Sequence, residues 1–242
     1  MTRPLKDLEG ILLVDKPAGI TSHDVVNHVR RKLKMKRIGH AGTLDPLATG
    51  LLVILVGKAT KLSSRLMNLD KEYEGTFELG KISDSHDCDG QILETRPIGP
   101  SLDREAIGTA MSSFVGDQYQ TPPMFSAVKI AGVPLYKHAR KGKVVPREPR
   151  FIRISKFELL DWKAPLGKFY IYCSKGSYVR TLVHDLGENL GCGGLLTQLR
   201  RTASHKLQVE HAITLEDFKS LAHAEISKRL IPGPQALALT NR

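Results

Sequence analysis

The sequence is poor in the residues that mark disulfide-rich, metal-binding and membrane proteins. It has three cysteines, none in a CxxC pair, so we expect a reducing compartment, the cytoplasm, with neither a disulfide framework nor a zinc site. The longest apolar run is Leu51–Val56, far shorter than the roughly twenty residues that span a membrane. The N-terminus lacks the apolar core of a signal peptide. We therefore expect a cytoplasmic protein that does not enter a membrane.

Acidic residues are also few, because 25 Asp and Glu accompany 36 Lys and Arg and leave a net charge of +11. Two stretches concentrate the excess: residues 25–44 have six basic residues and no acid, and residues 129–150 have seven against Glu148. A solvated surface would explain either stretch alone, but the two together favour contact with nucleic-acid phosphates. The candidate RNA-binding residues are Arg30, Arg31, Lys34, Lys36, Arg37, Lys129, Lys137, Arg140, Lys141 and Lys143.

The apolar pattern changes between helical and strand spacing without the regularity of βαβ units. Helical spacing appears at about 22–33, 103–114 and 178–190, and a last helix is expected from Thr214. Strands are expected at 51–57, 72–80, 151–160 and 168–174, and in 72–80 the residues Tyr73, Phe77 and Leu79 share one face. We therefore expect an α+β fold with a mixed, largely antiparallel sheet flanked by helices.

Two short segments resemble ligand-binding loops but fail in detail. Gly57-Lys58-Ala59-Thr60 lacks the upstream glycine and the hydroxyl residue after lysine that a Walker loop needs. The run Asp84–Gly90 would place Arg96 where a calcium loop has its bidentate glutamate, so we interpret it as a turn rich in Asp and Ser. We expect no metal and no cofactor.

The segment Gly39–Gly50 places a single carboxylate, Asp45, in a glycine-rich loop directly before the apolar strand. Pro46 biases Asp45 toward extended backbone, and the glycines permit close approach of a ligand or another backbone. The alternative is a turn-forming aspartate, since Asp before Pro often opens a turn. Residue chemistry alone favours this alternative.

Across its length the sequence resembles the TruB family of bacterial tRNA pseudouridine-55 synthases. Gly39–Gly50 resembles the family's catalytic motif, Asp15–Ser22 its N-terminal Lys-Pro motif, and Lys71–Tyr73 the segment with its active-site tyrosine. Residues that resemble the RNA-gripping thumb and the later motifs lie at 120–127, 134–142, 173–181 and 199–202. The segments follow the family's order and cover about residues 10–205.

The resemblance implies an isomerisation in which the N1–C1′ bond of a flipped-out uridine breaks, the base rotates, and C5 joins C1′. It implies that Asp45 is catalytic, either as a nucleophile at C1′ or as a base on the sugar, and the sequence leaves both routes open. It implies that Arg180 pairs with Asp45 and orients it, and that Tyr73 stacks on the uracil. The other implied substrate-binding residues are Tyr178, Leu199, His40 and Lys16.

The resemblance also implies a pseudouridine-synthase fold over residues 1–210, with a basic thumb insertion at about 120–150. Residues 211–242 are expected to form a short helical extension, without the PUA domain that many members carry. The implied partner is the T-stem-loop of tRNA, with uridine 55 as the target and a monomeric enzyme that needs no guide RNA. The alternative is an RNA-binding or tRNA-folding protein on the same scaffold without essential catalysis. The set of Asp45, Tyr73 and Arg180 favours the enzyme.

Overall fold

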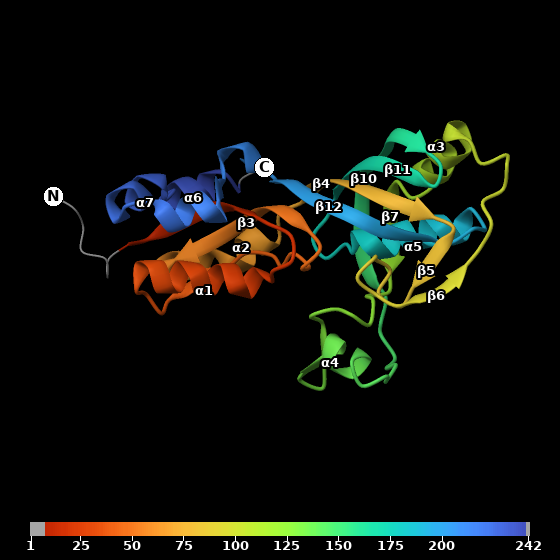
Figure 1. Ribbon diagram of the computed structural model, residues 1–242. Coiled ribbons are helices and arrows are strands. Elements are labelled where there is room, and N and C mark those ends of the chain that lie inside the picture. The colour runs from red at the N-terminus through yellow and green to blue at the C-terminus, as the bar shows by residue number, and fades with distance from the viewer. Residues whose placement is uncertain (1–7, 241–242) are drawn as a thin grey trace. The chain divides into compact units, whose positions relative to one another are not determined.

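The computed structural model describes residues 8–240, which form two compact units (Figure 1). Unit 1 comprises the described residues up to Tyr73 and those from Leu199 on, and unit 2 comprises Glu74–Gln198. Two strands, β4 (Lys71–Leu79) and β12 (Gly194–Ser204), begin in one unit and end in the other. The expected boundary at residue 210 stays a prediction. No helix within residues 8–240 is long and apolar enough to cross a membrane.

The sheet of unit 1 has the order β14-β1-β3-β12, with β2 paired to β3 and β13 to β12. β14 lies parallel to β1, β12 lies parallel to β3, and the remaining pairs are antiparallel. In the β1–β3 register Lys16 faces Gly50, which places Lys16 beside the end of the Asp45 loop. The strands are β1 (Gly10–Lys16), β2 (Ile38–His40), β3 (Thr49–Val56), β13 (Leu207–Gln208) and β14 (Ile213–Thr214).

Both faces of β1 and β3 are buried, which explains the uninterrupted apolar run Leu51–Val56. Apolar residues of η2, α2 and α8 pack on one face, in the cluster that includes Ile11 and Val53. Helix α1 begins with a capping box formed by Thr21 and Asp24, and it buries the predicted stripe from Val25 to Leu33. The helical segments are α1 (Ser22–Leu33), η2 (Gly57–Leu62), α2 (Ser63–Met67) and η3 (Val209–His211).

The C-terminal segment differs from the single helix expected from Thr214. It forms three short helices, α6 (Leu215–Ser220), α7 (His223–Arg229) and α8 (Gly233–Ala238). Thr214 caps the first, as expected, since its Oγ1 accepts a hydrogen bond from the amide of Asp217. Leu221 and Pro232 have extended backbone and separate the helices. The apolar spacing of the sequence did not predict these two interruptions.

Unit 2 contains the first part of β12 and the strands in the order β12-β4-β11-β10-β7, in which β10 is antiparallel to β11 and β7. Helix α3 contacts both β10 and α5. Together with unit 1 this gives the mixed, largely antiparallel sheet and flanking helices of an α+β fold, as predicted. The elements are β5 (Lys81–Ser83), β6 (Ile92–Thr95), α3 (Arg104–Ser112), β7 (Gly116–Gln120), β10 (Arg150–Lys163), β11 (Leu166–Cys173) and α5 (Val179–Asn189).

The alternation predicted for 72–80 is confirmed in β4. Tyr73, Phe77 and Leu79 are buried, and a Cβ on Gly75 would lie 2.5 Å from the ring of Phe169. A glycine is therefore needed at this point of the strand, because any side chain would displace a buried aromatic ring.

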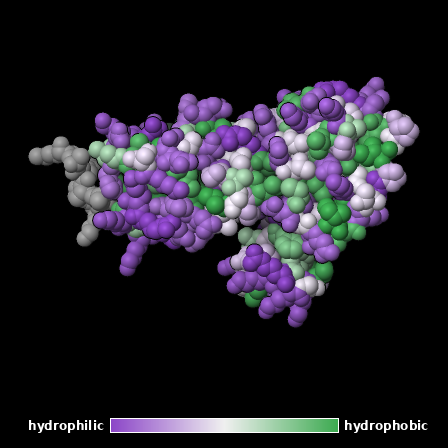
Figure 2. Space-filling view, in the orientation of Figure 1, coloured by the Kyte–Doolittle hydropathy of each residue, from purple (hydrophilic) through white to green (hydrophobic). Residues whose placement is uncertain are grey.

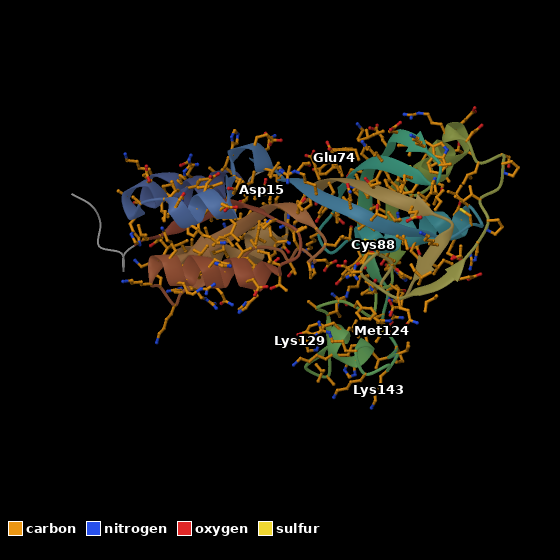
Figure 3. The ribbon with its side chains drawn as sticks, viewed as in Figure 1. Asp15, Glu74, Cys88, Met124, Lys129 and Lys143 are labelled. Atoms are coloured by element: carbon orange, nitrogen blue, oxygen red, sulfur yellow. The ribbon has the colours of Figure 1, made fainter. Side chains whose placement is uncertain are left out.

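The segment between β7 and β10, called the thumb below (residues 121–149), projects from unit 2 around a short helix (Figure 1). It contains β8 (Lys129–Ile130), β9 (Val133–Pro134) and α4 (Leu135–Ala139). Figure 2 shows strongly hydrophilic residues over its tip, and Figure 3 places Lys129 and Lys143 there. The expected bounds of the thumb, about 120–150, stay a prediction.

Candidate active site

Asp45 lies in a loop between β2 and β3 whose backbone is held on both sides of the carboxylate. On one side, the Ser22 hydroxyl of α1 donates to Leu44 O (3.1 Å) and accepts from Leu44 N (2.8 Å). On the other side, Lys16 Nζ donates to Pro46 O (3.3 Å). The side chain of Asp45 itself is half-buried. The loop therefore presents a fixed carboxylate that still reaches solvent.

Lys16 is fully buried, and its ammonium group donates to three carbonyl oxygens. Besides Pro46 O, these are Pro17 O and Ile20 O, each at 2.8 Å. Burial lowers the pKa of Lys16 from 10.5 to about 8, and the carboxylate of Asp45 opposes that lowering. The bonds to carbonyl oxygens indicate that Lys16 holds the Asp45 loop against β1, and its contact with substrate stays a prediction.

Arg201 of β12 reaches the same loop, and the sequence analysis did not single it out. Its side chain is 2% exposed and donates to the carbonyl oxygens of Gly42, Thr43 and Leu51. Arg201 lies in the segment 199–202 that resembles a later family motif, but the resemblance gave this residue no role.

His40 ends β2, five residues before Asp45, and it is half-buried. Burial lowers the pKa of its imidazole below 6.5, and the guanidinium of Arg201 lowers it further. The ring is therefore neutral at pH 7. A neutral aromatic ring suits the stacking role predicted for His40, which stays a prediction.

Three further residues were predicted to line the substrate pocket. Tyr73 is 9% exposed in β4, and Leu199 and Tyr178 are half-buried. Tyr178 is positioned by Gln120 of β7, whose side chain accepts from Tyr178 N (2.8 Å) and donates to Tyr178 O (3.1 Å). Gln120 directly precedes the thumb, and its side chain therefore connects the base of the thumb to the start of α5.

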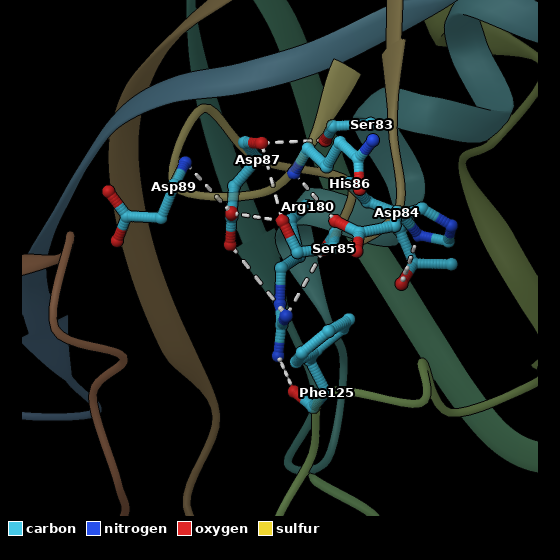
Figure 4. A network of polar contacts seen from close by, with 10 residues as sticks. Ser83, Asp84, Ser85, His86, Asp87, Asp89, Phe125 and Arg180 are labelled. Atoms are coloured by element: carbon cyan, nitrogen blue, oxygen red, sulfur yellow. Dashed lines mark hydrogen bonds and ion pairs between the residues drawn. The ribbon is translucent and has the colours of Figure 1, made fainter. Parts of the chain in front are cut away.

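Arg180, in the first turn of α5, is 4% exposed, and a polar network surrounds its guanidinium (Figure 4). It donates to Ser85 O (3.2 Å) and to Phe125 O (2.5 Å), and its Nη1 lies 3.7 Å from Asp87 Oδ2. Arg180 is therefore a buried residue and not a solvated surface arginine. Arg180 ties the base of the thumb to the turn that follows β5. Asp45 belongs to the other unit, so its pairing with Arg180 stays a prediction.

The turn at 83–90 is the Asx-rich turn that the sequence predicts. Asp87 is 5% exposed, and its Oδ1 accepts from Ser85 Oγ (2.5 Å) and from Asp89 N (3.2 Å). Ser83 Oγ donates to Asp87 O (2.6 Å). The turn thus aims the other carboxylate oxygen of Asp87 at Arg180 (Figure 4). Sequence reasoning assigned no role to Asp87, because the residues that surround it come from distant parts of the chain.

His86 and His184 fasten the same turn to α5. Their rings are stacked in parallel, 4.0 Å apart and inclined by 4°, and His86 Nδ1 lies 3.3 Å from Thr181 Oγ1. Burial lowers the pKa of His86 to about 3, with His184 and then Arg180 as further causes. The imidazole of His86 is therefore neutral at physiological pH, and it stacks on the ring of His184.

The candidate RNA-binding cations lie on the thumb and around the end of α1. On the thumb, Arg147 is the exception, because it donates to Pro122 O (3.1 Å) and closes the thumb's base. Near α1, Arg30 is half-buried and donates to Ile38 O (2.9 Å). The exposed candidates are Arg31, Lys34, Lys36, Arg37, Lys129, Lys137, Arg140, Lys141 and Lys143. These side chains can contact phosphates without first leaving another partner in a buried site.

Within residues 8–240 no three His, Cys, Asp or Glu side chains are grouped so that they could hold a metal ion. The buried cations Lys16, Arg180 and Arg201 donate mainly to backbone carbonyl oxygens.

The chain matches two family profiles over most of its length. Residues 30–179 match the N-terminal domain of the TruB family pseudouridylate synthases, and residues 180–237 match the C-terminal domain of tRNA pseudouridylate synthase B. It is 60% identical to the tRNA pseudouridine synthase B of Opitutus terrae, over 98% of each chain. It is 46% identical to the protein of the same name from Syntrophotalea carbinolica, over 95% of this chain and 75% of that one.

A solved structure shares the fold of the chain. The chain is similar to a crystal structure of a Cbf5–Nop10–Gar1 complex, with a TM-score of 0.75 and 27% identity over 98% of this chain. It spans 64% of that solved chain, so the neighbour has residues without counterpart here. The earlier resemblance is thereby confirmed by profiles, by relatives and by fold. The chain belongs to the TruB family of pseudouridylate synthases.

Proposed function

We propose that this chain converts uridine 55 in the T-loop of tRNA to pseudouridine, with Asp45 as its catalytic residue. As a member of its family it is an isomerase that forms pseudouridine. The relatives with high identity are named tRNA pseudouridine synthase B, which supports tRNA as the substrate. The position within tRNA rests on the motif resemblance alone.

The observation that carries the proposal is the Asp45 loop. A carboxylate that must reach C1′ of the ribose, as nucleophile or as base, needs a fixed position more than a particular pKa. Ser22 and Lys16 hold the residues directly before and after Asp45, as described above. A turn residue without catalytic work would not need this support on both sides.

In this mechanism the uridine leaves its stack and enters a pocket that includes Tyr73, Leu199 and Tyr178. Unstacking costs a few kcal/mol, and contacts between phosphates and the exposed cations offset that cost. Tyr73 stacks on the uracil while Asp45 acts at the sugar. Arg180 orients Asp45, and its own position is set by Asp87 and by Phe125 at the base of the thumb.

The test follows tritium release from uracil C5 in a T-arm hairpin labelled at all its uridines. We expect release with the wild type and loss of release with Asp45→Asn, while Asp161→Asn, an exposed carboxylate in β10, keeps wild-type release. A second hairpin with cytidine at position 55 should give none. RNA binding without release by the wild type would instead favour the non-catalytic RNA-folding alternative, and release from the second hairpin would refute position 55.

A further inference from the structure

We propose that Arg201 is a positioning residue for the isomerisation, whose guanidinium sets the backbone geometry of the loop that carries Asp45. The inference rests on the proposed function of Asp45 and deepens it. All the residues in the argument belong to unit 1.

The three bonds of Arg201 reach both ends of the loop. Nη2 donates to Gly42 O (3.3 Å) and Nη1 to Thr43 O (3.5 Å), before Asp45, and Nε donates to Leu51 O (2.6 Å), after it. A planar guanidinium offers its donors at fixed angles, so it fixes the separation and orientation of the acceptors. One rigid group therefore sets the span of the loop across Asp45.

The backbone of β12 contacts the loop as closely as the side chain does. Arg201 faces Gly50 in the parallel β12–β3 register. A Cβ on Gly50 would lie 2.3 Å from Arg201 O, and the backbone of Gly50 has a φ of +97°. Only glycine fits here, and its presence lets β12 approach near enough for the Arg201 side chain to reach under the loop. The strand and the loop are thus built as one unit around Arg201.

An ordinary RNA-binding arginine would look different. Arg201 is 2% exposed and its described bonds go to backbone oxygens, so its charge does not face a phosphate. Its neighbour Arg200 shows the contrast: its side chain is 42% exposed and forms a bidentate pair with Asp15, at 3.0 and 2.7 Å. Burying a guanidinium is costly unless its hydrogen bonds are satisfied. An apolar residue would fill the space without the free-energy cost of burying a charge. It would, however, make no hydrogen bonds to the two ends of the loop.

The consequence for catalysis follows from distance. A displacement of about 1 Å in a reacting group costs on the order of 10²-fold in rate. Loss of the three Arg201 bonds releases the loop on both sides of Asp45, while Lys16 and Ser22 still hold its centre. We therefore expect the rate of the chemical step to fall and the affinity for RNA to persist, because the exposed cations are untouched.

The experiment compares Arg201→Met, Arg201→Lys and, as a matched control, Arg200→Met. With a T-arm hairpin, we expect kcat to fall about 100-fold in R201M with KM within about 3-fold of the wild type. R201K keeps the positive charge but lacks the planar guanidinium, so its kcat should lie between those of the wild type and R201M. R200M should keep kcat within about 3-fold. R201K also keeps the inference testable if R201M fails to fold.

Hydrogen exchange without RNA supplies a readout that is independent of activity. We expect faster exchange in the peptides that cover residues 41–51 of the R201K variant, with unchanged exchange in β1. Wild-type kcat in R201M or R201K, or exchange that accelerates equally throughout unit 1, would overturn the inference in favour of general stabilisation. Failure of the proposed function looks different, because the wild type itself would release no tritium while the exchange comparison still reports the hold of Arg201.

Discussion

Replacement of Asp87 by asparagine tests whether the network around Arg180 depends on charge. Asparagine keeps the size of the side chain, and its oxygen can still accept from Ser85 Oγ and Asp89 N. Its amide nitrogen would then occupy the place of Oδ2, which lies 3.7 Å from Arg180 Nη1. A donor would therefore face a donor, and the buried guanidinium would lose the negative charge of Asp87.

The magnitude follows from the distance and the burial. Opposite unit charges at 3.7 Å attract by about 4.5 kcal/mol at an effective dielectric constant of roughly 20. Part of this attraction offsets the desolvation of the two groups, which are 4% and 5% exposed. Removal of one partner of a buried pair costs about 3–5 kcal/mol, because the other charge stays buried. Asparagine retains two of the hydrogen bonds, so we expect the lower value, about 3 kcal/mol.

Trp162 makes this loss measurable in unit 2 alone. It is the sole tryptophan of the chain, lies in β10, and stacks on Phe77 with ring centroids 6.2 Å apart. Its fluorescence during urea unfolding therefore reports the unit that contains Asp87 and Arg180. We expect Asp87→Asn to lower the free energy of unfolding by about 3 kcal/mol, and kcat to fall at least 10-fold because Arg180 loses its fixed position.

Asp89→Asn is the matched control, since Asp89 is exposed and contributes its backbone amide to the turn. An exposed substitution of this kind changes the free energy of unfolding by less than about 0.5 kcal/mol. Equal effects of the two substitutions, whether both small or both large, would refute the argument. Either result would mean that the Asp87–Arg180 attraction contributes nothing specific to unit 2.

Two further predictions concern the cations. Because burial lowers the pKa of Lys16 to about 8, the folded state loses this proton before the unfolded state does. Stability should therefore rise with pH above 8, and the unfolding free energy of the wild type relative to Lys16→Met should increase by about 2 kcal/mol between pH 7.5 and 9.5; a difference independent of pH would contradict this. On the thumb, Lys137→Ala with Lys141→Ala should weaken RNA binding and make the salt dependence of log K shallower by about 1.5, whereas exposed Lys163 and Lys168, changed together to alanine, should leave the slope unchanged.

Local patterns in the sequence predicted the elements whose partners lie close in the chain. The stripe from Val25 to Leu33, the alternation in β4 and the Asx-rich turn at 83–90 all appear as expected. Each depends on spacing or on side chains that bond to nearby backbone, which are properties a short window contains. The three short C-terminal helices were missed because the apolar spacing of the segment does not show the breaks at Leu221 and Pro232.

The site shows the opposite case. The motif resemblance led to Asp45 and Arg180, but no pattern pointed to Asp87 or Arg201 as the residues that hold their surroundings. Arg201 binds a carbonyl 150 positions away, and Arg180 binds one 95 positions away. The contacts of Arg201 depend on the register of β12 with β3 and on the close approach of Gly50 to β12. The residues next to Arg201 in the sequence determine neither of these.

The excess charge of +11 therefore has two physical origins rather than one. Lys16, Lys71 and Arg201 are at most 6% exposed and donate to backbone carbonyl oxygens near Asp45 and at the start of β4. Their charges cost free energy to bury, and their hydrogen bonds fix the Asp45 loop and the turn before β4. The exposed cations of the thumb and of the end of α1 have no such constraint and remain available to phosphates. Net charge alone would count both sets as affinity for RNA, but only the second set should appear in the salt dependence of binding.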